Sequence, residues 1–182
     1  MADFLYRIDL SIFYFFNHTL SNPVFNKFFA LITNVKNWMA IYILFALLLI
    51  IKGRKKGRVA LALTLIMITA TDQIGFRVLK EYFHRIRPCT ALHDAFLPVG
   101  PTGAFSFPSN HALNNFAIAT FFAILYPKYK TPLFITASLV AISRVYLGLH
   151  YPSDILGGAI IGTGFGFLFA YLHTLIMKYW KS

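Results

Sequence analysis

The stretch Ser143-Arg-Val-Tyr-Leu-Gly-Leu-His-Tyr-Pro-Ser-Asp154 joins two long apolar segments and contains an arginine, a histidine and a carboxylate. Polar and ionisable side chains are costly at membrane depth, so in a membrane chain they are default candidates for a functional site. A histidine beside an anion-binding arginine can attack phosphorus, and a nearby aspartate can hold its ring in one tautomer. The stretch therefore predicts phosphoryl chemistry at a junction between two helices.

The composition places this junction in a membrane protein. Of 182 residues, 58% are hydrophobic, 18% are aromatic and only 13% are charged, and the mean hydropathy is +0.64. A soluble domain of this length carries roughly 25% charged residues. We therefore expect an all-α integral membrane protein that forms one domain over residues 1–182.

The net charge of +11 raises the question of a nucleic-acid partner. Five of the 17 basic residues lie in the segment Lys52–Arg58 between two apolar segments, and four more are Lys128, Lys130, Lys178 and Lys181. Such placement is typical of cytoplasmic loops and tails under the positive-inside rule. We interpret the charge as a determinant of membrane topology and expect no nucleic-acid partner.

The apolar segments predict a multi-pass helical bundle with about five transmembrane helices. Two short N-terminal segments, 4–16 and 24–33, fall below the roughly 20 residues that a span needs, so we expect interfacial amphipathic helices there. Whether they add a sixth span stays open. Proline and cap signals help to place the starts of the later helices. The expected spans are 34–51, 59–80, 109–126, 131–147 and 152–178.

The predicted topology indicates on which side of the membrane each polar residue lies. With the segment Lys52–Arg58 on the cytoplasmic side, the polar residues at the ends of the later spans all fall at the opposite face. We therefore predict a protein of the plasma membrane (the inner membrane of a bacterium), with an active site facing the periplasm or the outside. The residues are Lys80, Arg87, Ser109, His111, Arg144, His150 and Asp154.

Two further motifs precede the opening stretch. Lys80 and Arg87 lie seven residues apart where a span ends, and such a pair can clamp a phosphate or merely reach toward lipid headgroups. Ser109 precedes an apolar segment as a helix cap, and the free N–H groups of a helix start also bind anions. His111, one turn inside, can protonate a leaving oxygen or be a structural histidine.

The opening stretch also has structural explanations. Asp154 suits the first turn of a helix because of the helix dipole, and Arg144 can compensate a nearby negative charge. Neither explains the spacing of both residues from His150. The glycines at four-residue intervals in the last span, by contrast, indicate close helix packing without chemistry; they are Gly158, Gly162 and Gly166.

Taken together, Lys80-x6-Arg87-Pro88, Pro108-Ser109-Asn110-His111 and Ser143-Arg144-x5-His150-x3-Asp154 resemble the tripartite signature of the type 2 phosphatidic acid phosphatase (PAP2) superfamily. All three motifs occur in order. The sequence departs from the signature once, because Asn110 stands where the family usually has glycine. That difference bears on the local backbone and on substrate range, and the asparagine can add a donor to a phosphate oxygen.

The resemblance implies a role for each residue. His150 is the nucleophile that forms a phosphohistidine, Asp154 orients it, and His111 is the general acid and then the base. The phosphoryl oxygens are bound by the remaining motif residues together with backbone amides; these residues are Lys80, Arg87, Ser109, Asn110 and Arg144.

The residue chemistry agrees with these roles. Positioned cations and helix-start donors can neutralise a phosphate ester without a metal, and the sequence lacks the carboxylate cluster of a two-metal phosphatase. We expect no metal, no cofactor and no protein partner, and a bell-shaped pH–rate profile. The expected substrate is a phosphorylated membrane lipid of the polyprenyl-diphosphate, lipid A 1-phosphate or phosphatidylglycerophosphate type. Two alternatives remain, a lipid phosphotransferase that uses the same phosphohistidine and a non-enzymatic transporter or scaffold.

Overall fold

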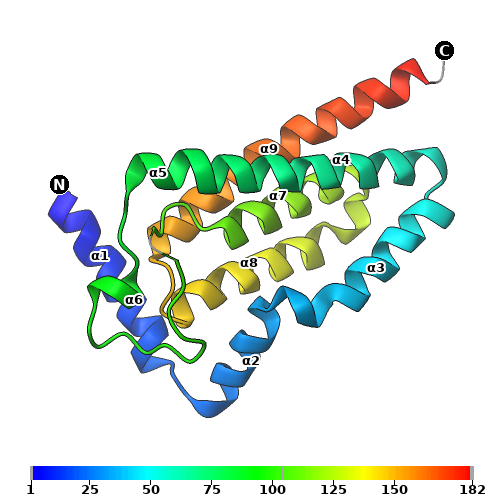
Figure 1. Ribbon diagram of the computed structural model, residues 1–182. Helices are drawn as coiled ribbons and strands as arrows, with labels where there is room; N and C mark the ends of the chain where they lie inside the picture. The colour runs from blue at the N-terminus through cyan, green and yellow to red at the C-terminus, as the bar shows by residue number, and fades with distance from the viewer. Residues whose placement is uncertain (1, 104, 181–182) are drawn as a thin grey trace.

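The computed structural model describes residues 2–103 and 105–180, and the regular secondary structure of this part of the chain is helical apart from one isolated antiparallel bridge between Ile86 and Phe105. The all-α prediction is therefore confirmed for the described residues. In chain order the helical elements are α1 Ala2–Tyr14, the π-helix η1 Phe15–Thr19, α2 Pro23–Thr33, α3 Val35–Ile51, α4 Arg54–Gln73, the π-helix η2 Ile74–Leu79, α5 Lys80–Phe83, α6 Pro88–Ala91, α7 Asn110–Leu125, the 3₁₀ turn η3 Pro127–Tyr129, α8 Lys130–Tyr146 and α9 Pro152–Tyr179 (Figure 1).

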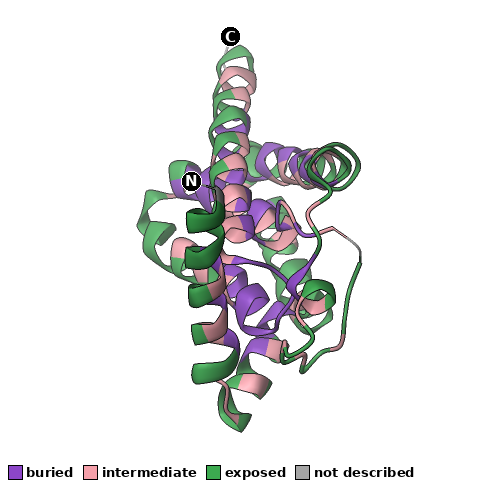
Figure 2. Ribbon diagram, turned by 90° about the vertical axis from the view of Figure 1, so that its left-hand side faces the viewer, coloured by how far each residue is buried: buried purple, intermediate pink, exposed green. Residues whose placement is uncertain are grey.

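Helix α7 lies at the centre of the bundle, where it packs along α9 and α8 and also contacts α4. Its side chains Leu113, Ala117 and Phe121 are at most 1% exposed. Buried residues lie on the inner faces of the helices, and the outward faces are exposed (Figure 2). Many of the exposed side chains are apolar, as expected where a helix faces lipid, and they include Ile41, Leu44, Leu65, Ile160 and Phe167.

The chain direction separates the two ends of the bundle. The basic segment Lys52–Arg58 lies where α3 meets α4, and the starts of α7 and α9 lie at the other end (Figure 1). Helices α4 and α8 run toward that second end, so their last turns meet the first turns of α7 and α9. The polar residues of the three motifs are therefore gathered at one end of the bundle.

Length and composition qualify two continuous helices as membrane spans, Arg54–Phe83 and Pro152–Tyr179. A third candidate is the pair α2 and α3, which is bent by 47° at a short break. Helices α7 and α8 have 16 and 17 residues and fall short of the same length criterion. The described helices thus support a multi-pass membrane protein with two or three candidate spans. They do not establish the five spans that the sequence predicts.

The N-terminal helix presents a polar inner face and an apolar outer face. Asp9, Phe13 and Asn17 are at most 6% exposed, and Asn17 donates to the carbonyl oxygens of Phe96 and Tyr146, both at 2.8 Å. Exposed apolar side chains cover the other side, as expected for a helix that lies against lipid. They are Phe4, Leu5, Ile8, Ile12 and Phe15.

The glycines of α9 bring its backbone against α7. A Cβ built at Gly158, Gly162 or Gly166 would lie within 2.1–2.7 Å of a backbone oxygen of α7 or its cap. Contacts this short cannot be accommodated without moving a helix, so only glycine permits the observed approach. The packing interpretation of these glycines is confirmed.

We predict that Gly162→Ala destabilises the protein by about 1–3 kcal/mol, because the new methyl group meets the carbonyl oxygen of Leu113. Thermal unfolding in detergent micelles measures the effect. Gly164→Ala is the matched control on the same helix, since a Cβ there meets no atom within 4 Å. Equal unfolding temperatures for the two variants would contradict this packing.

Candidate active site

Four segments meet at the motif end of the bundle and supply buried polar side chains. Lys80 follows η2 at the end of the second predicted span, Arg87 precedes α6, Arg144 lies in the last turn of α8, and His150 lies between α8 and α9. Their exposed fractions are 6%, 7%, 7% and 2%. Cations buried to this extent are unusual in proteins and need compensating partners.

The hydrogen bonds around His150 determine which ring nitrogen carries the proton. Arg87 Nη1 lies 2.9 Å from His150 Nε2 and also donates to the carbonyl oxygen of Leu149 at 2.9 Å. Because a guanidinium only donates, Nε2 must accept, and the proton of the neutral ring is then on Nδ1. Asp154 Oδ2 lies 3.4 Å from that Nδ1. This is the tautomer that leaves the Nε2 lone pair directed toward the cations.

The pKa of His150 favours the same neutral state. Burial lowers this pKa well below its ordinary value of 6.5, and the charges of Arg87 and Arg144 lower it further. Lys80 acts in the same direction, although more weakly. His150 is therefore an unprotonated imidazole at neutral pH, as a nucleophile needs to be.

Asp154 both caps helix α9 and lies beside His150. Its carboxylate is fully buried; Oδ2 accepts from the backbone N–H of Tyr151 at 2.8 Å, which completes a capping box at the start of α9. Oδ1 accepts from Arg85 Nη1 at 2.8 Å. The cap explains why the aspartate suits the first turn, and its position beside His150 explains the spacing in the sequence.

The turn after α8 fixes His150 relative to Arg144. The carbonyl oxygen of Arg144 accepts from the backbone N–H groups of both Leu149 and His150, at 3.0 and 3.1 Å. Gly148 has a φ of +77°, and a Cβ there would lie 2.7 Å from the carbonyl oxygen of Phe96. Glycine is therefore required both for the left-handed backbone and for the approach of the loop.

Arg144 and His111 meet the N-terminal half of the chain at Thr33, the last residue of α2. Arg144 Nη1 donates to Thr33 Oγ1 at 2.8 Å, and the His111 ring is hydrogen-bonded to the Thr33 backbone. The charges of Arg144 and Lys80 also act on the His111 ring, which lies within electrostatic range of both. The structure thus brings both histidines and the three predicted cations into one cluster.

Two guanidinium groups in this cluster have an unused donor. Arg87 Nε and Arg144 Nε are buried, and neither has a hydrogen-bond partner among the described residues. An unsatisfied buried donor on a charged group costs more than a neutral one, so such donors usually mark a site for an anionic acceptor. Their position beside His150 fits the oxygens of a phosphoryl group.

Ser109 and Asn110 lie at the start of α7. Ser109 is the N-cap of this helix, and its Oγ accepts from Ala112 N at 3.5 Å. The side-chain amide of Asn110 donates to Asp72 Oδ1 on α4 at 3.3 Å, and its side chain packs against Gly75. The prediction that Asn110 binds phosphate therefore rests on its backbone N–H, because its side chain is directed toward α4.

Three residues that contact the site were not predicted from the sequence. Arg85 lies inside the first motif and binds Asp154, and Asp9 of α1 in turn binds Arg85. Thr33 binds Arg144 from the break between α2 and α3. A carboxylate between Ile8 and Leu10 was the available signal for Asp9; no sequence pattern pointed to Thr33.

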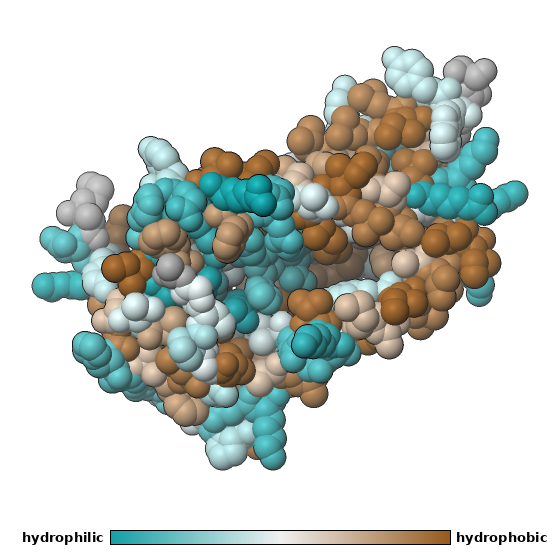
Figure 3. Space-filling view, in the orientation of Figure 1, coloured by the Kyte–Doolittle hydropathy of each residue, from teal (hydrophilic) through white to brown (hydrophobic). Residues whose placement is uncertain are grey.

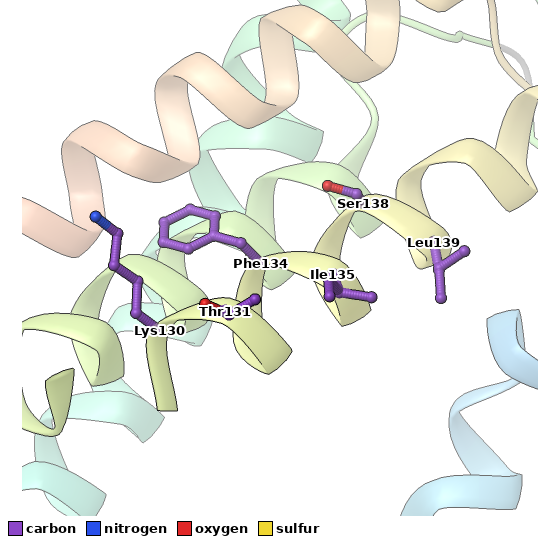
Figure 4. Close-up of a pocket in the computed structure, with 6 residues that line it drawn as sticks. All are labelled: Lys130, Thr131, Phe134, Ile135, Ser138 and Leu139. Carbon is purple, nitrogen blue, oxygen red and sulfur yellow. The ribbon is translucent and has the colours of Figure 1, made fainter. Parts of the chain in front are cut away.

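The described residues contain no group of three or more His, Cys, Asp or Glu side chains placed to hold a metal ion. Hydrophilic residues gather around a recess on one face of the molecule, beside α4 (Figure 3). A separate open groove of about 480 Å³ runs along α8 from Lys130 to Leu139, at the end of that helix away from Arg144 (Figure 4). Since none of its lining residues belongs to the three motifs, this groove is not part of the candidate site.

The fold and the cluster together define a helical membrane protein with a cationic, histidine-containing site for a phosphoryl group. The profile of the PAP2 superfamily matches residues 59–178 of this chain, and the chain belongs to that superfamily. The membership predicted from the three motifs is therefore confirmed.

Named relatives support the enzyme class. The lipid A 4'-phosphatase of Bacteroides thetaiotaomicron is 34% identical over 94% of this chain and 80% of its own length. The phosphatidylglycerophosphatase B of Bacillus subtilis is 34% identical over 55% of this chain and 52% of its own length. The undecaprenyl-diphosphatase of Sulfolobus acidocaldarius is 31% identical over 68% and 58%. The prediction of a lipid phosphatase is confirmed at the level of the family.

Solved structures show the same fold. LpxE of Aquifex aeolicus matches with a TM-score of 0.69 and 26% identity, over 88% of this chain and 93% of that protein. The PAP2-type phosphatidylglycerolphosphate phosphatase of Bacillus subtilis matches with a TM-score of 0.71 and 28% identity, over 94% and 87%. Because they cover 88% and 94% of this chain, both matches extend beyond residues 59–178, the region of the family profile.

We predict that Thr33→Val lowers kcat/KM about tenfold, because it leaves a buried guanidinium donor without its acceptor, at a cost of about 1–3 kcal/mol. Valine keeps the shape of the side chain, and the unpaired donor should also lower the unfolding temperature by a few degrees. Thr136→Val is the control, since that exposed hydroxyl bonds only to Pro132 of its own helix. Wild-type kcat/KM in Thr33→Val would show that Arg144 does not depend on α2.

Proposed function

We propose that this chain hydrolyses a phosphate or diphosphate headgroup of a membrane lipid, through a phosphohistidine on His150, at the outer face of the plasma membrane. The observation that carries the proposal is the neutral His150, with Nε2 facing Arg87 and the unpartnered Nε donors of Arg87 and Arg144 nearby. A nucleophile and pre-positioned cations are what a charged phosphate ester needs.

In the first step, Nε2 of His150 attacks phosphorus and the bond from phosphorus to the lipid oxygen breaks. Lys80, Arg87 and Arg144 hold the phosphoryl oxygens, and the negative charge of the bound phosphate favours a protonated His111. His111 gives its proton to the leaving oxygen. The proton on Nδ1 of His150 stays in place, and the Asp154 carboxylate stabilises the positive ring that forms.

In the second step, a water molecule replaces the histidine. His111, now neutral, accepts a proton from the water, whose oxygen attacks phosphorus while the bond to Nε2 breaks. Phosphate leaves and His150 returns to its neutral state. Ser109 and the backbone N–H groups of Asn110 and His111 add donors from the start of α7, where the helix dipole also favours an anion.

We also propose the finer arrangement in the membrane. One domain over residues 1–182 crosses the bilayer five times, with the short helix α7 packed against α4, α8 and α9. The segment Lys52–Arg58 faces the cytoplasm under the positive-inside rule, which puts the site at the periplasmic or outer side. A relative that aligns with 94% of this chain is named a lipid A 4'-phosphatase, and this supports lipid A as one candidate substrate.

The test is phosphate release by purified protein from phosphatidylglycerophosphate, lipid A and undecaprenyl diphosphate in detergent. We expect release from at least one lipid, unchanged by chelator, and a loss of about 10³-fold or more in His150→Ala. His173→Ala is the matched control, because His173 is also buried but binds the backbone of Lys56 at the other end of the bundle. Phosphate found on a second lipid instead of in solution would indicate a phosphotransferase, and no release or transfer would favour the non-enzymatic alternative.

We predict a bell-shaped dependence of kcat/KM on pH, with the acid limb of His150 below pH 6.5. The pKa of His150 is lowered, so the neutral nucleophile persists as pH falls and is lost only when pH drops below that lowered value. The ionisation of the phosphate substrate is titrated separately in the same micelles and subtracted. An acid limb of the enzyme at or above pH 6.5 would contradict the neutral, cation-flanked His150.

A further inference from the structure

A buried carboxylate of the N-terminal helix belongs to the same charge network as the proposed nucleophile. Asp9 of α1 is 6% exposed and pairs with Arg85 Nη2. It also accepts from Ser153, from the backbone N–H at 2.8 Å and from the hydroxyl at 2.5 Å. Asp9 thus uses both carboxylate oxygens to bind residues that adjoin the site.

Arg85 connects Asp9 to Asp154. Its Nη1 donates to Asp154 Oδ1 at 2.8 Å and to the Ser153 hydroxyl at 2.5 Å, and its guanidinium lies 4.1 Å from the centre of the Tyr151 ring. Asp154 faces His150 with its other oxygen. The chain of contacts therefore runs from Asp9 through Arg85 and Asp154 to His150.

Charge balance gives Asp9 an influence on the nucleophile. If Asp154 were the sole partner of Arg85, the guanidinium would neutralise much of the carboxylate charge that His150 needs. A second carboxylate on the far side of Arg85 takes a share of that positive charge. Because both carboxylates are buried and the Arg85 side chain is 25% exposed, the interactions are screened less than at a protein surface.

We propose that Asp9 is a positioning residue for catalysis: it holds Arg85 between two carboxylates, so that Asp154 keeps its charge and its orientation toward His150. The proposal rests on the phosphatase function proposed above. Asp9 lies well before residue 59, where the match to the family profile begins. Helix α1 is therefore part of the active site, although it supplies no group that touches the substrate.

The purely structural alternative is that Asp9 only attaches α1 to the bundle. That role would lower the unfolding temperature of an Asp9 variant without changing its turnover. A positioning role changes kcat, and it leaves KM unchanged because Asp9 does not contact the bound lipid. The two roles therefore predict different kinetic results.

The first test is Asp9→Asn, which keeps the shape of the side chain and removes its charge. We expect kcat to fall about tenfold with KM within about twofold of wild type. In metal sites, removing the hydrogen-bond partner of a metal-bound histidine costs about 10–100-fold, and we expect the low end of that range for this more remote residue. Asp3→Asn is the matched control, because Asp3 is an exposed acid on the same helix and its variant should match wild type. Unchanged kcat in folded Asp9→Asn would overturn the proposal.

The second test uses charge compensation. Arg85→Gln leaves Asp9 and Asp154 facing each other without a cation, which favours protonation of Asp154 and a larger loss of kcat. Adding Asp9→Asn removes this repulsion, so the double variant should be at least as active as Arg85→Gln alone. A double variant whose loss equals the product of the two single losses would overturn the proposal, since independent residues behave in that way.

Two further observations keep these tests decisive. If Asp9→Asn does not fold, Ser153→Ala removes one contact of Asp9 while both charges remain; we expect a fall in kcat of about threefold, and unchanged kcat would overturn the proposal. A wild-type protein that releases no phosphate from any lipid would instead refute the proposed function. That failure is distinct, because it is visible before any Asp9 variant is compared.

Discussion

The structure depends on keeping one neutral imidazole among several buried cations. Arg87 donates to Nε2 of His150 and Asp154 lies beside Nδ1, so the ring is held in a single tautomer with its lone pair on the cationic side. Buried cations are expensive without partners, and the chain stabilises them with carbonyl oxygens, a threonine hydroxyl and carboxylates. The Nε donors of Arg87 and Arg144 remain unpartnered among the described residues, and a phosphoryl group would satisfy them.

The helical scaffold makes this arrangement possible because the residues of the candidate site lie at the ends of the helices and not in their middles. The start of α7 with its free backbone donors, the start of α9 and the final turn of α8 meet at one end of the bundle, while glycines let α9 approach α7 closely. The N-terminal helices complete the enclosure: Thr33 contacts Arg144, and Asp9 reaches Arg85. A helix with an apolar outer face is thereby linked to the charge balance of the nucleophile.

Much of this was predictable from local sequence patterns. Proline and cap residues placed α8 and α9 within one or two residues of their observed bounds, and the motif spacing anticipated the cluster around His150. The contacts of Asp9, Arg85 and Thr33 were not predictable, because they join segments more than 60 residues apart and no periodicity encodes them. The direction of the Asn110 side chain depends on the space left by Gly75, and the span count depends on a bend between α2 and α3.

The central claim is the protonation state of His150, and nitrogen NMR of ¹⁵N-histidine-labelled protein in micelles measures it most directly. The His150 signals are assigned by their absence in His150→Ala. At pH 7 the account predicts a neutral ring with the proton on Nδ1 and an unprotonated Nε2. A ring protonated on Nε2, or a doubly protonated imidazolium, would contradict it.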